Sequence, residues 1–209
     1  MKQLPRLYCI VDSAFFRTTA ELVDFAGQLV AGGCALLQYR NKLGNAQVML
    51  EQARELRRLS RAGASASQMR LIMNDRADLS LAAEFDGVHV GQEDLSPESV
   101  RKIIGPERWL GVSTHNPEQL SEADLTTADY LAIGPVFATS SKERPDPVIG
   151  LEGVRRARQL TRKPLVAIGG ITRVNAASVV EAGADSVAVI SDLLREPRKS
   201  AEEFFRILR

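Results

Sequence analysis

The sequence predicts an α/β protein built as a single (β/α)8 barrel of the TIM type over residues 1–209. Short apolar runs of strand length alternate with segments of helical periodicity along the whole chain. Such alternation indicates a parallel sheet with helices outside it. Eight similar units favour a closed barrel over an open sheet, and 209 residues lie near the lower end of the roughly 200–400 residues of such barrels.

Each expected strand is a continuous apolar run that ends abruptly in polar residues. The clearest pair is residues 71–73, followed by Asn74 and Asp75, and residues 88–90, followed by Gly91. Continuous apolar character is typical of strands that are buried on both faces of a parallel sheet. In chain order the expected strands are residues 7–11, 35–37, 71–73, 88–90, 109–112, 130–133, 165–168 and 186–190.

The helices are predicted from their caps as well as from their periodicity. Thr18 and Glu21 have the spacing of a capping box before a helix that ends at Gly32. Asn45 can cap a long helix through residue 62, and the segments 96–97 and 116–117 place proline at the first helical position. The remaining helices are expected between residues 74 and 87 and at 151–160, 174–182 and 201–208.

The composition excludes several functional classes. With 27 basic and 26 acidic residues the net charge is +1, so no global field attracts nucleic acid or an anionic membrane. No apolar run reaches the ~20 residues that span a bilayer, and no signal-peptide pattern opens the chain. Two cysteines form neither a disulfide framework nor a ligand-spaced cluster. We therefore expect a soluble, reduced, cytoplasmic protein and leave monomer and homo-oligomer open.

Two aspartates are the candidate metal ligands. Asp75 and Asp94 follow neighbouring parallel strands, so both carboxylates should lie at the C-terminal edge of the barrel, where the sites of such barrels are found. Mg²⁺ is commonly held by one or two carboxylates together with substrate phosphates. Each aspartate could instead serve a helix, as a cap or as an acid in the first turn.

Cations converge on the same edge. Gln38, Arg40 and Lys42 alternate along an extended segment, so their side chains should point the same way into the barrel mouth. The alternative for Arg40 and Lys42 is an ordinary solvated strand end. A further cation and two neutral donors are expected at this rim: Lys142, Asn74 and Ser113. The combination favours a Mg²⁺-bound diphosphate.

A second anion site is expected after the last two strands. Gly169-Gly170 and Ile190-Ser191 expose backbone amides there, and barrels frequently bind a phosphate at this place. Glycines also serve ordinary turns, which is the alternative. The long segment 134–150 is predicted to be a lid, and the alternative is an insertion that is disordered in the empty protein.

The two histidines are not candidates for catalysis. His89 lies inside a strand and is expected to line the barrel. His115 lies at the rim, but no nucleophile and acid are spaced to form a triad with it.

These motifs, in this order, resemble the thiamine phosphate synthase family over nearly the full length of the chain. The segments that carry the resemblance are 38–42, 74–76, 91–94, 111–113, 134–137, 139–142, 169–171 and 190–191. The resemblance implies a (β/α)8 transferase of alkyl or aryl groups in thiamine biosynthesis. Members of the family join hydroxymethylpyrimidine diphosphate to a thiazole phosphate and release pyrophosphate.

The resemblance also implies roles for individual residues. The diphosphate substrate would be bound by Gln38, Tyr39, Arg40, Asn41, Lys42, Asn74, Ser113 and Lys142. Mg²⁺ would be coordinated by Asp75 and Asp94, and the thiazole phosphate bound by Thr139, Ser140, Ser141, Gly170, Ile190 and Ser191. The catalytic residues would be Arg40, Lys42, Ser113 and Lys142. The family's Thr-x-Thr appears here as residues 139–141, with serine in the last place.

Two other functions fit the same fold. A thiazole tautomerase is a related barrel that needs a phosphate site but no diphosphate site, and the cationic and acidic residues of the mouth argue against it. A non-catalytic barrel that binds phosphate metabolites would bind ligand without Mg²⁺-dependent turnover.

Overall fold

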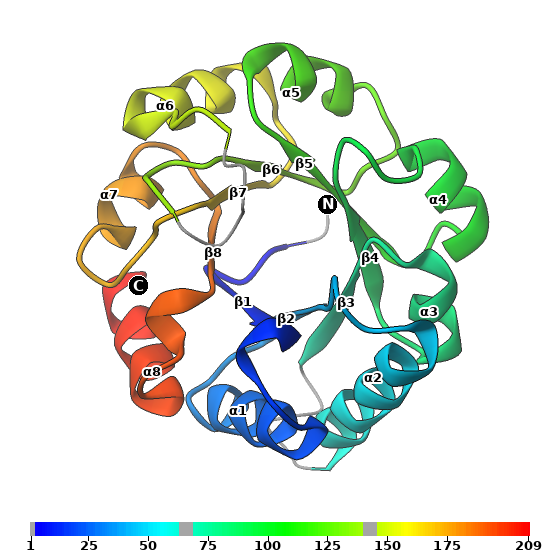
Figure 1. The fold of residues 1–209 in the computed structure, drawn as a ribbon. Helices are drawn as coiled ribbons and strands as arrows, with labels where there is room; N and C mark the ends of the chain where they lie inside the picture. The colour runs from blue at the N-terminus through cyan, green and yellow to red at the C-terminus, as the bar shows by residue number, and fades with distance from the viewer. Residues whose placement is uncertain (1–2, 63–68, 140–145) are drawn as a thin grey trace.

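The computed structural model describes residues 3–62, 69–139 and 146–209 of the chain. Eight parallel strands form a closed barrel in sequence order, and β8 pairs with β1 to close it. Figure 1 shows the barrel in end view, with the helices as an outer ring. The strands are β1 (Leu7–Asp12), β2 (Leu36–Arg40), β3 (Arg70–Asn74), β4 (Gly87–Val90), β5 (Trp109–Thr114), β6 (Tyr130–Ile133), β7 (Leu165–Ile168) and β8 (Ser186–Val189).

The helices follow the strands as predicted. They are α1 (Thr19–Ala31), α2 (Ala46–Arg61), α3 (Ala77–Ala82), α4 (Pro97–Ile104), α5 (Pro117–Asp124), α6 (Gly150–Leu160), α7 (Ala176–Glu181) and α8 (Pro197–Ile207). Two 3₁₀ turns, η1 (Ser13–Phe15) and η3 (Ser191–Leu193), follow β1 and β8. The (β/α)8 barrel predicted from the sequence is confirmed.

The predicted caps explain where helices start. The Thr18 hydroxyl accepts the Glu21 amide of α1 at 3.2 Å, and Asn45 accepts the Val48 amide of α2 at 3.0 Å. Several boundaries differ by one to four residues, and the largest shift of a helix start is at α8, which begins at Pro197 rather than at residue 201. Proline is well suited to a first helical turn, since it has no amide that would need a partner there.

Alternation along each strand separates two apolar layers. Inward-facing residues such as Tyr8, Leu36 and Tyr130 fill the barrel, while outward-facing residues such as Leu7 and Leu37 pack against the helices. Because β2 alternates in this way, Gln38 and Arg40 face the interior and Tyr39 faces the helices. The interior positions closest to the C-terminal strand ends are therefore free to form a site.

Candidate functional site at the barrel mouth

Asp75 and Asp94 lie together where β3 and β4 end. Asp75 has a left-handed backbone, with φ +60°, which is uncommon for a residue other than glycine. Its amide donates to the His89 carbonyl at 2.8 Å, which fixes this conformation. The Asp94 carboxylate accepts the Gly91 amide at 2.7 Å. The neighbourhood of two carboxylates predicted from the sequence is therefore present.

The electrostatics of this pair favour a nearby cation. Burial raises the pKa of Asp75, the Lys42 ammonium opposes that rise, and the nearby Asp94 adds to it. Two like charges at close range favour either a shared proton or a bound cation. Within the part of the chain that the structure describes, no group of three or more His, Cys, Asp or Glu side chains could hold a metal. A two-carboxylate set fits Mg²⁺, which takes its other ligands from water and phosphate.

Arg40 and Lys42 reach the mouth from β2, and each is paired with an aspartate. Lys42 Nζ forms an ion pair with Asp75 Oδ2. Arg40 Nη1 pairs with Asp12, which ends β1 and is only 4% exposed. Sequence reasoning had not assigned Asp12 to the site, although its position directly after an apolar strand is the signal that had selected Asp75.

Asn74 supplies a free donor at the same edge. Its Nδ2 is buried and has no hydrogen-bond partner among the described residues. Buried side-chain donors are nearly always satisfied in native proteins. An acceptor oxygen on a ligand at this edge would satisfy the Asn74 donor.

Ser113 is held from two sides. His89 Nε2 lies 2.8 Å from its hydroxyl oxygen, and Gln92 donates to its carbonyl at 2.6 Å. Burial lowers the pKa of His89 from 6.5 to about 4, with a smaller opposing effect of Asp94. The imidazole is therefore neutral near pH 7. His89 lines the barrel as expected, but the sequence did not indicate its contact with Ser113.

The side chains of Tyr39 and Asn41 do not join the others, and the expectation that these residues bind substrate stays a prediction. The Tyr39 hydroxyl donates to Gln52 at 2.5 Å on the helix side of the barrel. Asn41 donates to Tyr39 at 3.1 Å and accepts the Gly44 amide at 2.6 Å. Strand alternation turns both side chains away from the mouth and toward the helices. From that side they support the loop that carries Lys42.

The predicted phosphate loops lie side by side, because they follow the paired strands β7 and β8. Gly170 has φ +61°, and a Cβ there would lie 2.5 Å from the Ala138 carbonyl oxygen. Only glycine allows this approach. Ile190 and Ser191 form the start of η3. Thr139 is half-buried at the edge of the described chain, and Ser140, Ser141 and Lys142 lie outside the described residues.

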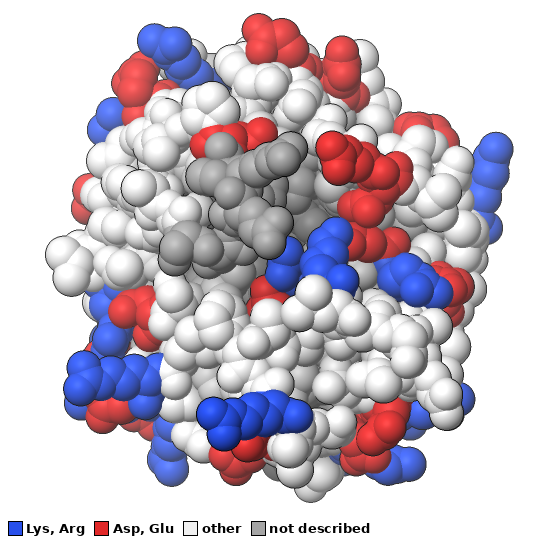
Figure 2. Space-filling model, viewed as in Figure 1, with Lys and Arg blue, Asp and Glu red and all other residues white. Residues whose placement is uncertain are grey.

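Figure 2 shows this face of the molecule, with basic and acidic side chains adjacent near its centre. None of the described helices has both the length and the apolar character needed to cross a membrane. The mouth thus combines paired carboxylates, two cationic side chains and neutral donors. That set suits a highly charged anion bound with a divalent cation.

Comparisons with known proteins identify the family of this chain. Residues 7–193 match the family described as thiamine monophosphate synthase. A thiamine-phosphate synthase of Koribacter versatilis is 60% identical over 209 residues, covering 99% of this chain and 97% of that protein. That of Chloroflexus aurantiacus is 44% identical over 186 residues, covering 89% and 83%. The solved thiamine phosphate pyrophosphorylase of Pyrococcus furiosus superposes with a TM-score of 0.85 at 34% identity, covering 97% and 95%. The chain therefore belongs to the thiamine monophosphate synthase family.

Proposed function

We propose that this chain is a Mg²⁺-dependent thiamine-phosphate synthase. It transfers the hydroxymethylpyrimidine group from its diphosphate to 4-methyl-5-(2-phosphoethyl)thiazole, giving thiamine phosphate and pyrophosphate. The observation that supports it most is the Asp75–Asp94 pair beside Lys42, with the partnerless amide of Asn74 at the same edge. We place the enzyme in the cytoplasm and assign it small-molecule substrates.

The reaction is a substitution at the methylene carbon of the pyrimidine. The carbon–oxygen bond breaks, its electron pair leaves with the diphosphate, and the thiazole nitrogen forms the new carbon–nitrogen bond. The electron-rich aminopyrimidine supports positive charge at that carbon, so no side-chain nucleophile is needed. This agrees with a mouth that offers charges and neutral donors.

The chain's own residues stabilise the departing charge. Arg40 and Lys42 bring positive charge to the place where the leaving group becomes more negative. Lys42 is half-exposed, at 49% of its side chain, and can exchange its Asp75 partner for a phosphate oxygen. Mg²⁺ held by Asp75 and Asp94 would supply further charge neutralisation. Lys142 is proposed as a third cation.

The other substrate is assigned to the loops after β7 and β8. Its phosphate would meet the amides of Gly170, Ile190 and Ser191, with hydroxyls from residues 139–141. The close approach of Gly170 to Ala138 brings the start of segment 134–150 next to this loop. The two subsites would then share one wall, as a direct transfer between substrates requires.

The test is release of pyrophosphate by the purified protein with both substrates and Mg²⁺. Asp75→Ala and Asp94→Ala are compared with Glu93→Ala, which removes an exposed carboxylate from the same loop as Asp94. We expect the wild type to release pyrophosphate only when both substrates are present. Release should fall steeply in the two aspartate variants and stay at the wild-type level in the Glu93→Ala control. Undiminished release in Asp75→Ala and Asp94→Ala would remove the metal assignment. No release from the wild type would remove the proposed function.

A further inference from the structure

A chain of hydrogen bonds crosses the barrel interior and ends at Ser113. Gln38 Nε2 donates to the Tyr8 hydroxyl at 2.9 Å, and that hydroxyl lies 2.9 Å from the hydroxyl of Tyr130. Tyr130 lies 3.1 Å from His89 Nδ1, and His89 Nε2 lies 2.8 Å from Ser113 Oγ. Five strands contribute one side chain each, and the two tyrosines are each 1% exposed. The chain thus links the buried centre of the barrel to its mouth.

The donors and acceptors fix the direction of this chain. Each hydroxyl has one hydrogen to donate. Because Tyr8 accepts from Gln38, its own hydrogen goes to Tyr130, the other group within reach of that hydroxyl among the described residues. Tyr130 then donates its hydrogen to His89 Nδ1. With the Gln38 amide nitrogen turned toward Tyr8, a chain that ran the other way would leave the buried Tyr8 hydroxyl hydrogen without an acceptor, which is costly.

The direction determines the tautomer of His89. With Nδ1 accepting from Tyr130, the neutral ring carries its hydrogen on Nε2. Nε2–H therefore donates to Ser113 Oγ, and the hydrogen of Ser113 remains available. Ser113 lies at the end of β5, next to β4 and the site, so that hydrogen can serve a ligand in the mouth.

Gly111 makes the central contact possible. A Cβ at this position would lie 2.4 Å from His89 Nδ1 and 2.4 Å from the Tyr130 hydroxyl oxygen. Because glycine has no side chain, the His89–Tyr130 hydrogen bond can occupy the space where a Cβ would lie. Packing also holds the rings in place, since the centroids of His89 and Tyr130 are 5.5 Å apart. The contact is therefore supported by the neighbouring strand as well as by its own geometry.

We propose that His89 is a positioning residue, held as the Nε2–H tautomer by the Gln38–Tyr8–Tyr130 chain, which makes Ser113 a hydrogen-bond donor to an acceptor atom of the pyrimidine diphosphate. Ser113 then acts with Asn74 Nδ2, which has no hydrogen-bond partner among the described residues. The inference rests on the proposed function for the identity of the substrate. The tautomer itself is a property of the free protein.

The tautomer is measured by nitrogen NMR on protein labelled with ¹⁵N-histidine. The chain has only two histidines, and a His115→Gln variant assigns the signals. We expect His89 as the Nε2–H tautomer, and loss of that preference in Tyr130→Phe, which removes the donor to Nδ1. An Nδ1–H tautomer would overturn the proposal, because a Gln38 amide turned by half a rotation would then accept from Tyr8 and reverse the chain. The spectrum reports the tautomer whether or not pyrophosphate is released. Failure of the proposed function can therefore be distinguished from failure of the tautomer assignment.

Kinetics test the positioning role. Loss of the donor in His89→Asn should raise KM for the pyrimidine diphosphate or lower kcat by roughly tenfold, the size expected for one hydrogen bond, and leave KM for the thiazole phosphate unchanged. His89→Gln places an amide nitrogen near the position of Nε2 and should recover part of the loss. Ser113→Ala combined with His89→Asn should be no worse than Ser113→Ala alone. Fully additive losses, or equal losses for both substrates, would contradict the role.

Discussion

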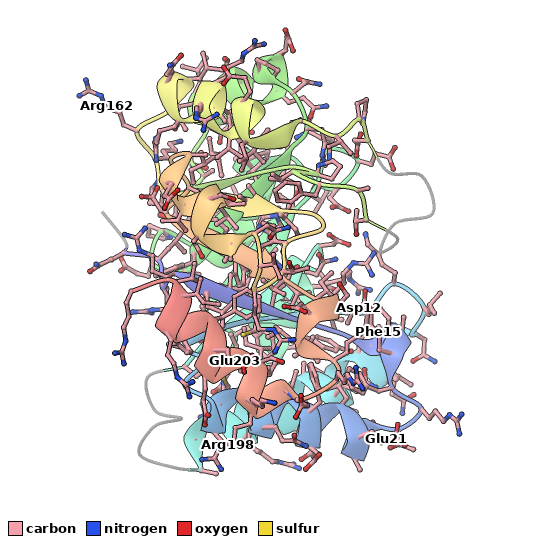
Figure 3. All side chains as sticks on the ribbon, turned by 90° about the vertical axis from the view of Figure 1, so that its left-hand side faces the viewer. Asp12, Phe15, Glu21, Arg162, Arg198 and Glu203 are labelled. Carbon is pink, nitrogen blue, oxygen red and sulfur yellow. The ribbon has the colours of Figure 1, made fainter. Side chains whose placement is uncertain are left out.

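The two ends of the barrel use aspartate in opposite ways. At the N-terminal end, an aspartate precedes each of β4, β6 and β8, and each is satisfied by an arginine and by a backbone amide. At the mouth, Asp75 and Asp94 face each other, and Asn74 Nδ2 has no hydrogen-bond partner among the described residues. Figure 3 shows the two ends in side view, with Asp12 and Phe15 at the mouth and Arg162 at the opposite end.

The three aspartates at the N-terminal end, Asp86, Asp129 and Asp185, each join a strand to a helix in the same way, and we call these contacts the N-terminal clamps. Asp129 accepts from Arg101 of α4 and from the Leu110 amide of β5, both at 2.8 Å. Asp185 accepts from Arg158 of α6 and from the Leu165 amide of β7, both at 2.8 Å. Asp86 repeats the pattern with Arg57 at 3.1 Å and the Leu71 amide at 2.7 Å. The quarter formed by β1 and β2 differs, since Cys34 and Ala35 precede β2.

The difference indicates that aspartates at the N-terminal end stabilise the barrel, whereas aspartates at the mouth are arranged for function. A carboxylate that binds a backbone amide and a guanidinium locks a strand to a helix and has little capacity left for a ligand. A pair of crowded carboxylates with a strained backbone at Asp75 costs stability, and on our proposal it retains affinity for a cation. Conserving such strain at a functional site is a common compromise.

The largest effect is expected from neutralising the mouth. Asp75→Asn should lower the rate of pyrophosphate release by roughly a hundredfold or more, because charge stabilisation of the leaving group is lost. Its thermal midpoint should stay the same or rise, because repulsion from Asp94 is removed. Steady-state kinetics and thermal unfolding measured on the same sample check both parts. A lower thermal midpoint with full activity would contradict the contrast between the mouth and the N-terminal end.

Breaking a clamp should act on stability alone. Asp129→Ala leaves Arg101 and the Leu110 amide without their shared partner, at a cost of about 2 kcal/mol in free energy of unfolding, discounted for partial exposure. Urea unfolding measures this loss. Pyrophosphate release well below the melting temperature should equal that of the wild type. A large fall in that rate would show that the two ends are coupled.

A glycine at the mouth offers a more local change. Gly170→Ala places a Cβ 2.5 Å from the Ala138 carbonyl at a φ of +61°, so the loop must move. We expect KM for the thiazole phosphate to rise by roughly tenfold, as for loss of about one hydrogen bond, with KM for the diphosphate substrate unchanged. Gly105→Ala is the control, since φ is +75° there and no atom lies within 4 Å. Equal kinetic effects of both substitutions would contradict the assignment.

The smallest effect should come from the support of Arg40. Asp12→Asn keeps an acceptor for the Ala14 amide but removes the charge paired with Arg40. We expect KM for the diphosphate substrate to rise only a few fold, roughly the free-energy contribution of one partly exposed ion pair. Substrate titration against a fixed thiazole phosphate concentration measures it. An unchanged KM would mean that Arg40 keeps its place without Asp12.

The sequence predicted the barrel because buried parallel strands leave a strong signal. The runs at residues 71–73 and 88–90 are buried on both faces, and polar residues mark their C-terminal ends. The same logic located Asp75, Asp94 and Arg40. Their mutual approach could be expected because parallel strands carry their ends to one edge.

The rest depended on contacts that no local pattern encodes. Tyr39 and Asn41 lie in the same segment as Arg40, and only the strand's orientation decides which side chains enter the barrel. The link from His89 to Ser113 joins two strands across the interior. The clamps do leave a periodic trace, an aspartate before each of three even-numbered strands. Their arginine partners follow from helix rotation, which periodicity alone does not fix.

The most direct test compares Asp75→Asn with Asp129→Asn, two identical substitutions at opposite ends of the barrel. Pyrophosphate release and the thermal midpoint are measured on the same preparations of each. Asp75→Asn should lose release and keep its midpoint, whereas Asp129→Asn should keep release and lose several degrees, as expected for about 1–2 kcal/mol in a chain of this size. The same response from both variants would contradict the division between a functional mouth and a stabilising base.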